Sequence, residues 1–552
     1  MTTNQLYYGD NLDILRTHIP DESVDLIYID PPFNSNQAYN VIFSETDGTS
    51  SQAQIQAFED TWHWGEPTEQ AYHDLVTTAP PLLVETIKSF RSFLTETNLM
   101  AYLVMMAGRL VELHRVLKPT GSFYLHCDPT ASHYLKIIMD GIFGVENFRN
   151  EIVWERTNAH NMKARYFSKI HDLLLFYSKG DRYTWNQQYT EYSDAQLSRY
   201  KTDEAGRLYT GRDLTMSTVM ESRNFEWRGA RPPAHRSWGA SLEQLEQWYA
   251  EGRILLKADG TPRLDGLKVY LDELPGKQIP SIWNDIPRIG NTSKERLGYP
   301  TQKPLALLER IIKASSNEGD VVLDAFAGCG TTIEAAAKLK RQWIGIDITH
   351  LAISLLKYRL ADAFGDDVEY EIIGEPKDEA SARTLAIQDR YQFQWWALSL
   401  IRARPYQGKK KGADEGVDGV LYYQDVDPDN PKKTLTRKII VQVKSGKVSV
   451  ADIRELKTVV KNQDAVIGVF ITLNPPTQPM VKEATTAGGF QWLHVAHTTY
   501  PRIQIRTIQE LLEGLGIEYP QTLDDVTFRR AERATSQNQQ LPLTGISQQT
   551  EE

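Results

Sequence analysis

Short apolar runs that alternate with helix-like segments constrain the fold of this chain most strongly. The run Val24–Ile29 is mostly apolar, and it is flanked by segments that can form helices. Similar runs recur at Ser122–His126, Val321–Leu323 and Gln342–Ile346. Helical patterns cover Leu99–Leu117, Lys303–Ser315 and Thr331–Leu339. Because parallel strands buried on both faces read as continuous apolar runs, the sequence predicts an α/β fold with parallel strands.

The pattern of residue types changes between Asp181 and Asn291, where charged and aromatic residues replace the apolar runs. Seven arginines there, 199, 207, 212, 223, 228, 231 and 236, are interleaved with Tyr200, Tyr209, Trp227 and Trp238. The pattern predicts an inserted, largely non-core module. It is typical of a nucleic-acid contact surface, and a solvated charged surface is the alternative.

The segment Asp30-Pro31-Pro32-Phe33 directly follows the first apolar run. Open α/β sheets bind ligands at the carboxyl ends of their strands. The Asp30 carboxylate and the Pro31 carbonyl can accept hydrogen bonds from an exocyclic amine, the prolines fix the backbone, and Phe33 offers a ring for stacking on an extruded base. The segment therefore predicts methylation of a base amine, with an ordinary Pro-Pro turn as the alternative.

A glycine turn follows the strand Val321–Leu323 and opens a helix at Thr331. Gly328 and Gly330 allow the backbone to approach a ligand closely, and Asp347 ends the next strand, where an acid can bind ribose hydroxyls. These features alone fit a nicotinamide cofactor and S-adenosylmethionine equally, since both carry an adenosine. The missing third glycine and the Asp30 segment favour S-adenosylmethionine.

Taken in order, the Asp30 segment, the arginine-rich insert, Thr301-Gln302-Lys303-Pro304 and the glycine turn resemble the β group of DNA amino-methyltransferases. The resemblance covers roughly residues 5 to 375. It implies a Rossmann-like methyltransferase with an inserted target recognition region, in which Asp30, Pro31, Pro32 and Phe33 are catalytic and hold the target base. It assigns cofactor binding to a second set of residues: Gln302, Lys303, Asp324, Phe326, Gly328, Gly330 and Asp347.

The first residue of the catalytic segment bears on the target base. Family members with Asp there usually act on adenine N6 and those with Ser on cytosine N4, so Asp30 favours adenine. Phe33, in place of the commoner Tyr, keeps the stacking face and lacks the hydroxyl. The insert is then expected to contact double-stranded DNA despite a formal net charge of -11, which averages over the whole chain.

A third region carries the turn Gly416-Val417-Asp418-Gly419 and the apolar strand Ile439–Val443, which continues into Lys444. Strand alternation puts Gln442 and Lys444 on one face, and an adjacent strand can bring Asp418 beside them. The pattern resembles the Mrr-type branch of the restriction-endonuclease-like fold over about residues 385 to 510. It implies catalytic roles for these three side chains, with Asp418 and Gln442 holding Mg²⁺ and Lys444 activating a water.

The nuclease interpretation has open points. Gln442 leaves one clear acidic ligand, and Glu415 is the candidate for a second. An inactive DNA-binding relic and an unrelated α/β domain are the alternatives.

Several features of the sequence bear on the cellular location of the protein and on its partners. Cys127 and Cys329 are the two cysteines and lie in no zinc-like spacing, which fits a reducing cytoplasm. We expect a cytoplasmic protein, because the sequence shows no export signal and no membrane-spanning run. The sequence contains no Gly-x-x-x-x-Gly-Lys-Ser/Thr loop, so an ATP-driven motor would be a separate subunit. A homodimer is compatible with the sequence.

The length of 552 residues predicts several domains. We expect a catalytic half at 1–180, a recognition insert at 181–295, a cofactor-binding half at 296–375, a nuclease-like domain at 385–515 and a disordered tail at 531–552.

The expected function is site-specific methylation of adenine N6 in DNA, with a Mg²⁺-dependent endonuclease in the same chain, as a single-chain restriction-modification protein. The first alternative is a solitary methyltransferase, acting on adenine N6 or cytosine N4, whose C-terminal domain only binds DNA. A nicotinamide-dependent oxidoreductase is the rival from another class.

Overall fold

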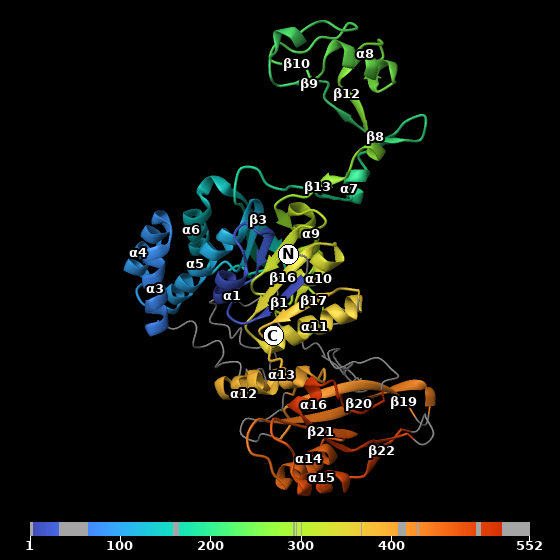
Figure 1. Ribbon diagram of the computed structural model, residues 1–552. Helices are drawn as coiled ribbons and strands as arrows, with labels where there is room; N and C mark the ends of the chain where they lie inside the picture. Colours follow the sequence, from blue (N-terminus) through green and yellow to red (C-terminus); the bar gives the residue numbers. More distant parts are fainter. Residues whose placement is uncertain are drawn as a thin grey trace, which may run out of the picture. The chain divides into compact units, whose positions relative to one another are not determined.

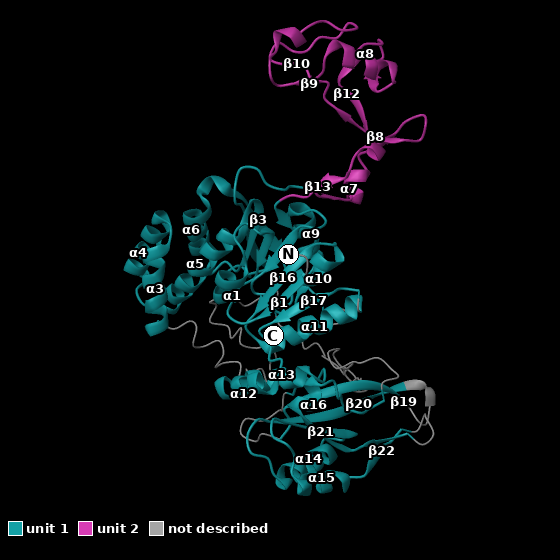
Figure 2. Ribbon diagram, viewed as in Figure 1, with its two compact units in different colours: residues 1–186, 281–552 teal, residues 187–280 magenta. Residues whose placement is uncertain are grey.

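The computed structural model (Figure 1) describes residues 4–32, 64–157, 165–290, 293, 295–297, 299, 301–365, 367–406, 416–427, 430–492 and 498–520. The chain divides into two compact units, one of residues 1–186 with 281–552 and one of residues 187–280 (Figure 2). The second unit lies within the predicted insert 181–295. The predicted tail 531–552 lies outside the described residues. In the described part of the chain, every helix is too short or too polar to cross a bilayer.

The first unit contains a nine-stranded sheet in the order β14-β4-β5-β3-β2-β15-β16-β1-β17. Its strands are β1 (Asn4–Tyr8), β2 (Val24–Ile29), β3 (Leu117–Cys127), β4 (Phe148–Glu155), β5 (His171–Ser178), β14 (Ile282–Trp283), β15 (Val321–Asp324), β16 (Gln342–Asp347) and β17 (Tyr370–Ile373). Neighbouring strands are parallel except β5, which runs antiparallel to β3 and β4. The predicted α/β fold with a parallel sheet is confirmed.

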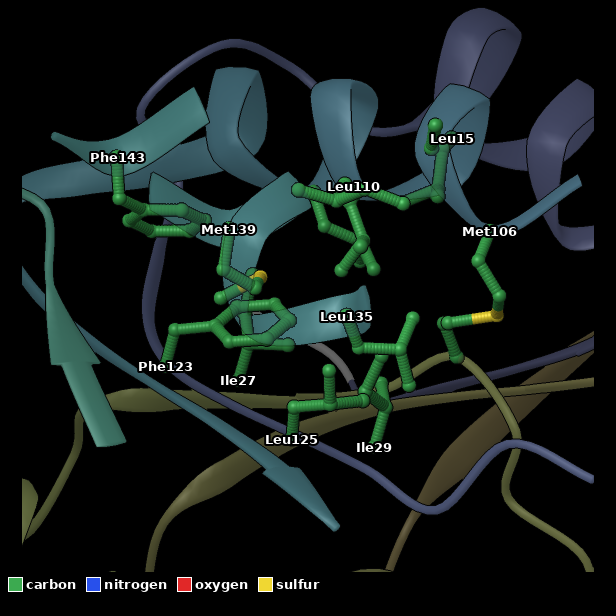
Figure 3. Close-up of a cluster of buried hydrophobic side chains, with 14 of the residues drawn as sticks. Leu15, Ile27, Ile29, Met106, Leu110, Phe123, Leu125, Leu135, Met139 and Phe143 are labelled. Carbon is green, nitrogen blue, oxygen red and sulfur yellow. The ribbon is translucent and has the colours of Figure 1, made fainter. Parts of the chain in front are cut away.

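Eight helices accompany this sheet in the described residues: α1 (Asn11–His18), α3 (Glu66–Thr78), α4 (Pro81–Leu94), α5 (Asn98–Val116), α6 (Ser132–Phe143), α9 (Leu305–Ser315), α10 (Thr331–Lys338) and α11 (His350–Phe364). Figure 3 shows α5 and α6 packed on the sheet, where Ile27 and Ile29 of β2 lie in one cluster with Leu110 and Met139. Burying each such side chain stabilises the fold by about 1.5–3 kcal/mol. This core holds the carboxyl end of β2 in place.

The passage from α5 to β3 differs from the prediction. The helical pattern was expected to reach Leu117 and the strand to begin at Ser122, but β3 already begins at Leu117. A Cβ built on Gly121 would lie 2.5 Å from the Leu117 side chain, so glycine allows the strand to fold closely over that leucine.

The second unit has short strands and two helices: β6 (Tyr189–Thr190), α7 (Asp194–Leu197), β7 (Lys201–Thr202), β8 (Leu208–Arg212), β9 (Thr215–Met216), β10 (Ser237–Trp238), α8 (Leu242–Ala250), β11 (Ile254–Leu256), β12 (Pro262–Tyr270) and β13 (Lys277–Gln278). Trp227 and Trp238 are buried with Leu214 and Leu245 in a small core. The predicted module thus has a small core of its own, which these tryptophans fill and which the sequence pattern did not indicate.

The C-terminal part of the first unit has a five-stranded sheet in the order β18-β19-β20-β21-β24. Its elements are α12 (Glu379–Gln388), α13 (Arg390–Ser399), β18 (Arg404–Pro405), β19 (Gly419–Asp427), β20 (Asn430–Lys444), α14 (Val450–Asn462), β21 (Ile467–Thr472), α15 (Gln478–Thr485), β22 (Gly489–Gln491), β23 (Thr499–Pro501), β24 (Ile503–Thr507) and α16 (Ile508–Leu512). β19 and β20 are antiparallel, and β20, β21 and β24 are parallel.

Helix α13 joins this sheet to the larger one through two adjacent tryptophans. Trp396 packs into the core on one face of the five-stranded sheet, whereas Trp395 packs with Leu351 and Leu355 of α11. The Gln392 side chain also accepts a hydrogen bond of 3.0 Å from the His350 amide. The two sheets therefore share a packed helix.

Candidate active sites

The two segments with the strongest predicted chemistry leave neighbouring strands of the larger sheet. β2 and β15 are parallel, and Leu323 lies opposite Ile27. Asp30 follows β2, and the glycine turn follows β15, so both segments emerge at the same sheet edge. The Asp30 carboxylate also forms an ion pair with the Lys303 ammonium group. Phe33 lies outside the described residues.

Only one oxygen of Asp30 takes part in that ion pair. The Oδ2 atom contacts Lys303, whereas Oδ1 is buried and has no hydrogen-bond partner among the described residues. Pro31 is buried and Pro32 is half-buried beside it. The catalytic segment thus keeps one carboxylate oxygen available as an acceptor.

The Asp324 side chain stabilises the glycine turn through hydrogen bonds to residues on both sides of it. Its Oδ1 accepts a hydrogen bond from the Phe326 amide at 3.0 Å, and its Oδ2 accepts one from the Thr332 hydroxyl at 2.6 Å. Burial raises the pKa of Asp324 to about 7, with a smaller contribution from the nearby Asp30 charge, while these two hydrogen bonds lower it. The side chain of Phe326 is half-buried and packs against the main core.

The two glycines of the turn serve different contacts. Both have left-handed backbones, with φ of +50° at Gly328 and +78° at Gly330. A Cβ at Gly330 would lie 2.6 Å from Leu356 Cγ, so this glycine lets the turn pack on α11. A Cβ at Gly328 would instead meet the Tyr299 ring at 3.3 Å. Gly328 is therefore the glycine that faces the site.

Asp347 holds the same turn from the neighbouring strand. Its Oδ2 accepts a hydrogen bond from the Gly328 amide at 2.9 Å, and its Oδ1 accepts two from Thr349 at 2.9 Å. Burial raises the pKa of Asp347, while these hydrogen bonds lower it. Burial and the charges of Asp347, Cys329, Asp30 and Asp324 also raise the pKa of Tyr299, which places that ring among these groups.

Gln302 and Lys303 act differently although they are adjacent. The side-chain amide of Gln302 accepts a hydrogen bond from the backbone amide of Leu297 at 2.9 Å and donates one to the backbone carbonyl of Glu295 at 2.6 Å. It therefore fixes its own loop. Lys303 reaches Asp30, so the loop before α9 contacts the predicted catalytic segment as well as the glycine turn.

A polar network contacts the segment that leads into the glycine turn, and the sequence analysis did not predict it. Asn11, which is buried, donates to the Ala325 carbonyl at 2.7 Å and accepts from Arg109 Nε at 2.5 Å. Arg109 also pairs with Asp10 at 2.7 Å. The available signal was Arg109 itself, the first charged residue after the uncharged run 99–108 of α5.

A second missed network lies under Asp30. The Tyr28 hydroxyl is 2.9 Å from His126 Nδ1, and His126 Nε2 is 3.4 Å from Asp172. Burial raises the pKa of Asp172. The hydrogen bond and charge of His126, together with the charges of Lys303 and Arg156, lower it by more, so the net shift of this pKa is downward. Lys303 therefore pairs with Asp30 and also acts through its charge on Asp172.

The predicted nuclease residues meet where β20 ends. The Asp418 amide donates to the Val441 carbonyl at 2.9 Å, and Asp418 Oδ2 accepts from the Val443 amide at 2.7 Å. Gln442 is buried and Lys444 is half-buried, two residues further along the same strand. The Gln442 Oε1 atom has no hydrogen-bond partner among the described residues.

The donor set for a metal is small. No group of three His, Cys, Asp or Glu side chains is placed to hold a metal ion in the described ranges. Glu415 lies outside those ranges. The unsatisfied Gln442 oxygen beside Asp418 nevertheless fits a cation, because amide and carboxylate oxygens are ligands that Mg²⁺ accepts.

The arginines of the second unit are partly occupied within it. Arg207 pairs with Asp272 at 2.7 Å, Arg228 with Glu246 at 2.7 Å and Arg236 with Asp213 at 2.8 Å. Arg199 and Arg212 form no ion pair with any residue that the structure describes. Arg223 and Arg231 likewise form no ion pair there, so four arginines of the second unit have no acidic partner among the described residues.

Two regions of the chain match families of known proteins. Residues 24–357 match the family described as DNA methylase, and residues 386–495 match the family described as restriction endonuclease. The type II methyltransferase M.EcaI of Enterobacter cloacae is 29% identical over 65% of this chain and 69% of its own length. The DNA adenine methyltransferase YhdJ of Escherichia coli K12 is 27% identical over 64% of this chain and 82% of its own.

A solved structure also aligns with part of this chain. The PvuII DNA methyltransferase, described as cytosine-N4-specific, aligns with 68% of this chain and 95% of its own at 12% identity and a TM-score of 0.34.

Proposed function

The chain belongs to the DNA methylase family that its residues 24–357 match, and from this membership we propose that it transfers a methyl group from S-adenosylmethionine to adenine N6 in double-stranded DNA. One observation carries the proposal: Asp30 and the glycine turn leave adjacent parallel strands at one sheet edge. A base amine held at Asp30 and a cofactor held at Gly328 can therefore meet, and such positioning is a large part of catalysis of a two-substrate reaction.

The residues present fit S-adenosylmethionine, which supplies an electrophilic methyl group when bound. The left-handed backbone of Gly328 and the amides at the start of α10 offer close backbone approach, and Asp347 offers carboxylate oxygens. Lys303 fixes one oxygen of Asp30, and the other remains an acceptor for an amine hydrogen. The Pro31 carbonyl is the second proposed acceptor. Two fixed acceptors favour the pyramidal amine geometry that attack requires.

Adenine is the proposed target because Asp, rather than Ser, occupies the first position of the catalytic segment. The relative YhdJ is described as a DNA adenine methyltransferase, which supports the same assignment. Mass spectrometry of nucleosides from DNA methylated by this protein tests it. N6-methyladenine is expected, and N4-methylcytosine in its place would contradict the choice of base.

The test of the methyltransferase centre is Asp30→Ala. We expect methyl transfer from labelled S-adenosylmethionine to DNA to be lost, while calorimetry shows cofactor affinity close to that of the wild type. Asp74→Ala, an exposed carboxylate on α3, is the matched control and should leave both measurements unchanged. Loss of cofactor affinity in the Asp30 variant would contradict the role assigned to this residue.

For the C-terminal domain we propose Mg²⁺-dependent cleavage of DNA, which makes the protein a single-chain restriction-modification enzyme. Asp418 and Gln442 would hold the metal, which lowers the pKa of a bound water, and Lys444 would orient that water toward a phosphodiester. The supporting observation is the meeting of Asp418, Gln442 and Lys444 at the end of β20. If neither wild type nor Lys444→Ala cleaves unmethylated plasmid with Mg²⁺, the domain only binds DNA.

A further inference from the structure

The two faces of β20 point to different parts of the nuclease domain. Val441 and Val443 belong to the core that contains residues of α13, whereas Ile440 packs with Ile453 and Leu456 of α14. Since side chains alternate along a strand, Gln442 and Lys444 lie on the α14 side, as Ile440 does. The predicted active site therefore faces helix α14.

One carboxylate of α14 reaches the same place. A Cβ built on Gly416 would lie 3.0 Å from Glu455 Oε1 and 3.5 Å from Gln442 Nε2. Gly416 is two residues before Asp418 and has φ of +67°, a backbone that glycine adopts readily. The side chains of Glu455 and Gln442 thus converge on the space that the missing side chain of Gly416 leaves open.

Among the described residues, none neutralises the charge of Glu455. Glu455 is exposed and forms no hydrogen bond or ion pair with any described residue. The two nearest cations on its helix are engaged elsewhere, because Arg454 and Lys457 both pair with Glu483, at 3.3 and 2.7 Å. Residues one or two positions apart on a helix do not face each other, and the positions that do face Glu455, which are 451, 452, 458 and 459, hold no cation.

A second, independent observation points to a ligand. Gln442 is 2% exposed, and its Oε1 atom has no hydrogen-bond partner among the described residues. A buried acceptor without a partner has lost its hydration without replacement, so such groups are rare unless something else satisfies them. In the structure the Gln442 amide turns its nitrogen toward this space, and turning the amide over exchanges Nε2 and Oε1. A cation between Asp418, Gln442 and Glu455 would then satisfy this oxygen and the unpaired carboxylate together.

We propose that Glu455 of helix α14 is the second acidic ligand of a divalent cation in the nuclease centre. The strand position where an acid would stand holds Gln442, and the helix facing it provides the carboxylate instead. The inference rests on the proposed nuclease function, since it completes the donor set of the same site. With Asp418 and Glu455, the centre has the two carboxylates that hold Mg²⁺ at many phosphoryl-transfer sites.

The test measures metal binding directly. Mn²⁺ titrated calorimetrically into the full-length protein is expected to bind Glu455→Gln at least about 10-fold more weakly than the wild type, because one of two charged ligands is lost. Glu513→Gln removes an exposed carboxylate at the end of α16 and is the matched control. Plasmid cleavage should fall in Glu455→Gln and partly recover at higher Mg²⁺, while methyl transfer stays unchanged as a sign of intact folding.

A shorter side chain sharpens the test. Glu455→Asp keeps the charge and withdraws it by one methylene, so we expect Mn²⁺ affinity between that of the wild type and that of Glu455→Gln. Wild-type affinity in both variants, together with a loss in Asp418→Ala, would overturn the role of Glu455 and leave the nuclease proposal intact. A wild-type protein that binds no Mn²⁺ and cleaves no DNA would overturn the nuclease proposal, and this inference with it.

Discussion

The two proposed catalytic centres of this chain differ in how far the protein satisfies its own polar groups. At the methyltransferase centre, Asp324 and Asp347 each accept several hydrogen bonds, and Asp30 is paired with Lys303 through one oxygen while its other oxygen is the single acceptor of these three carboxylates left without a partner among the described residues. At the nuclease centre, Gln442 keeps a buried oxygen without a partner and Glu455 has no cation beside it, within the described residues.

The difference matches the two kinds of ligand. A base amine and an organic cofactor are recognised by a few acceptors at fixed positions, and internal hydrogen bonds keep those acceptors fixed. A metal ion needs several oxygens at once, so a protein that satisfied those oxygens internally would compete with the ion. The methyltransferase centre is therefore built to hold its shape, and the nuclease centre to gain a partner.

The largest expected effect separates the two centres by activity. Lys444→Ala should lower plasmid cleavage by about 10²–10⁴-fold, the range for loss of a group that assists proton transfer, because the attacking water loses its orienting ammonium. Methyl transfer should remain within twofold of wild type, roughly the level of assay error. Cleavage and methylation assays on one preparation give both numbers. A parallel loss of methylation would break the comparison, since the centres would then not be independent.

Lys303→Met asks whether the ion pair at Asp30 matters for chemistry. The variant keeps most of the side-chain volume but leaves the partly buried carboxylate without its cation. We expect methyl transfer to fall by about 10²-fold, because an acceptor that is no longer fixed stabilises the transition state poorly. Cofactor affinity should change much less. Lys313→Met, on the exposed side of α9 and paired with Glu309, is the control.

The contrast between the centres also explains what the sequence could predict. The apolar run Val24–Ile29 and the glycine turn were correctly placed because burial and turn geometry are local properties. The contacts of Asn11 with Ala325 and of Lys303 with Asp30 join residues about 300 positions apart, and no local pattern encodes such pairings. For the same reason Glu455 was overlooked, since its relevance depends on which face of β20 the helix α14 covers.

The tryptophans of the second unit show the limit of composition. Trp227 and Trp238 stand among arginines in the sequence, a pattern typical of nucleic-acid surfaces, yet both lie in a core. A small domain must bury its large apolar rings first, and a pattern of residue types cannot show which rings remain for a ligand. Better candidates for DNA contact than the aromatic residues are the four arginines that form no ion pair among the described residues, which are Arg199, Arg212, Arg223 and Arg231.

The two glycines of the cofactor turn allow a finer test of the methyltransferase centre. Gly330→Ala should lower the free energy of unfolding by about 1–3 kcal/mol, because the new Cβ meets Leu356 and the backbone is left-handed. Gly328→Ala should cost less stability and more cofactor affinity, since its Cβ points to Tyr299 at the site. Urea unfolding and calorimetry of both variants separate the effects. Equal changes in both variants would contradict the division of roles.

The smallest effect concerns the pH dependence of that rigid centre. Burial raises the pKa of Asp324 to about 7 from 3.8, so the folded state binds a proton that the unfolded chain has released. The contribution to stability is present at low pH and is lost as the pH rises through this window, by about 1 kcal/mol between pH 5 and pH 6. Asp324→Asn cannot ionise, so its unfolding free energy should fall less over that interval. Urea unfolding of wild type and variant at both pH values measures the difference in slope, which is insensitive to any uniform loss from the altered hydrogen bonds. If the slopes agree, Asp324 is already ionised in the folded protein. The turn would then be held by a charged acceptor, and the electrostatic contrast between the two centres would be smaller than their hydrogen bonds suggest.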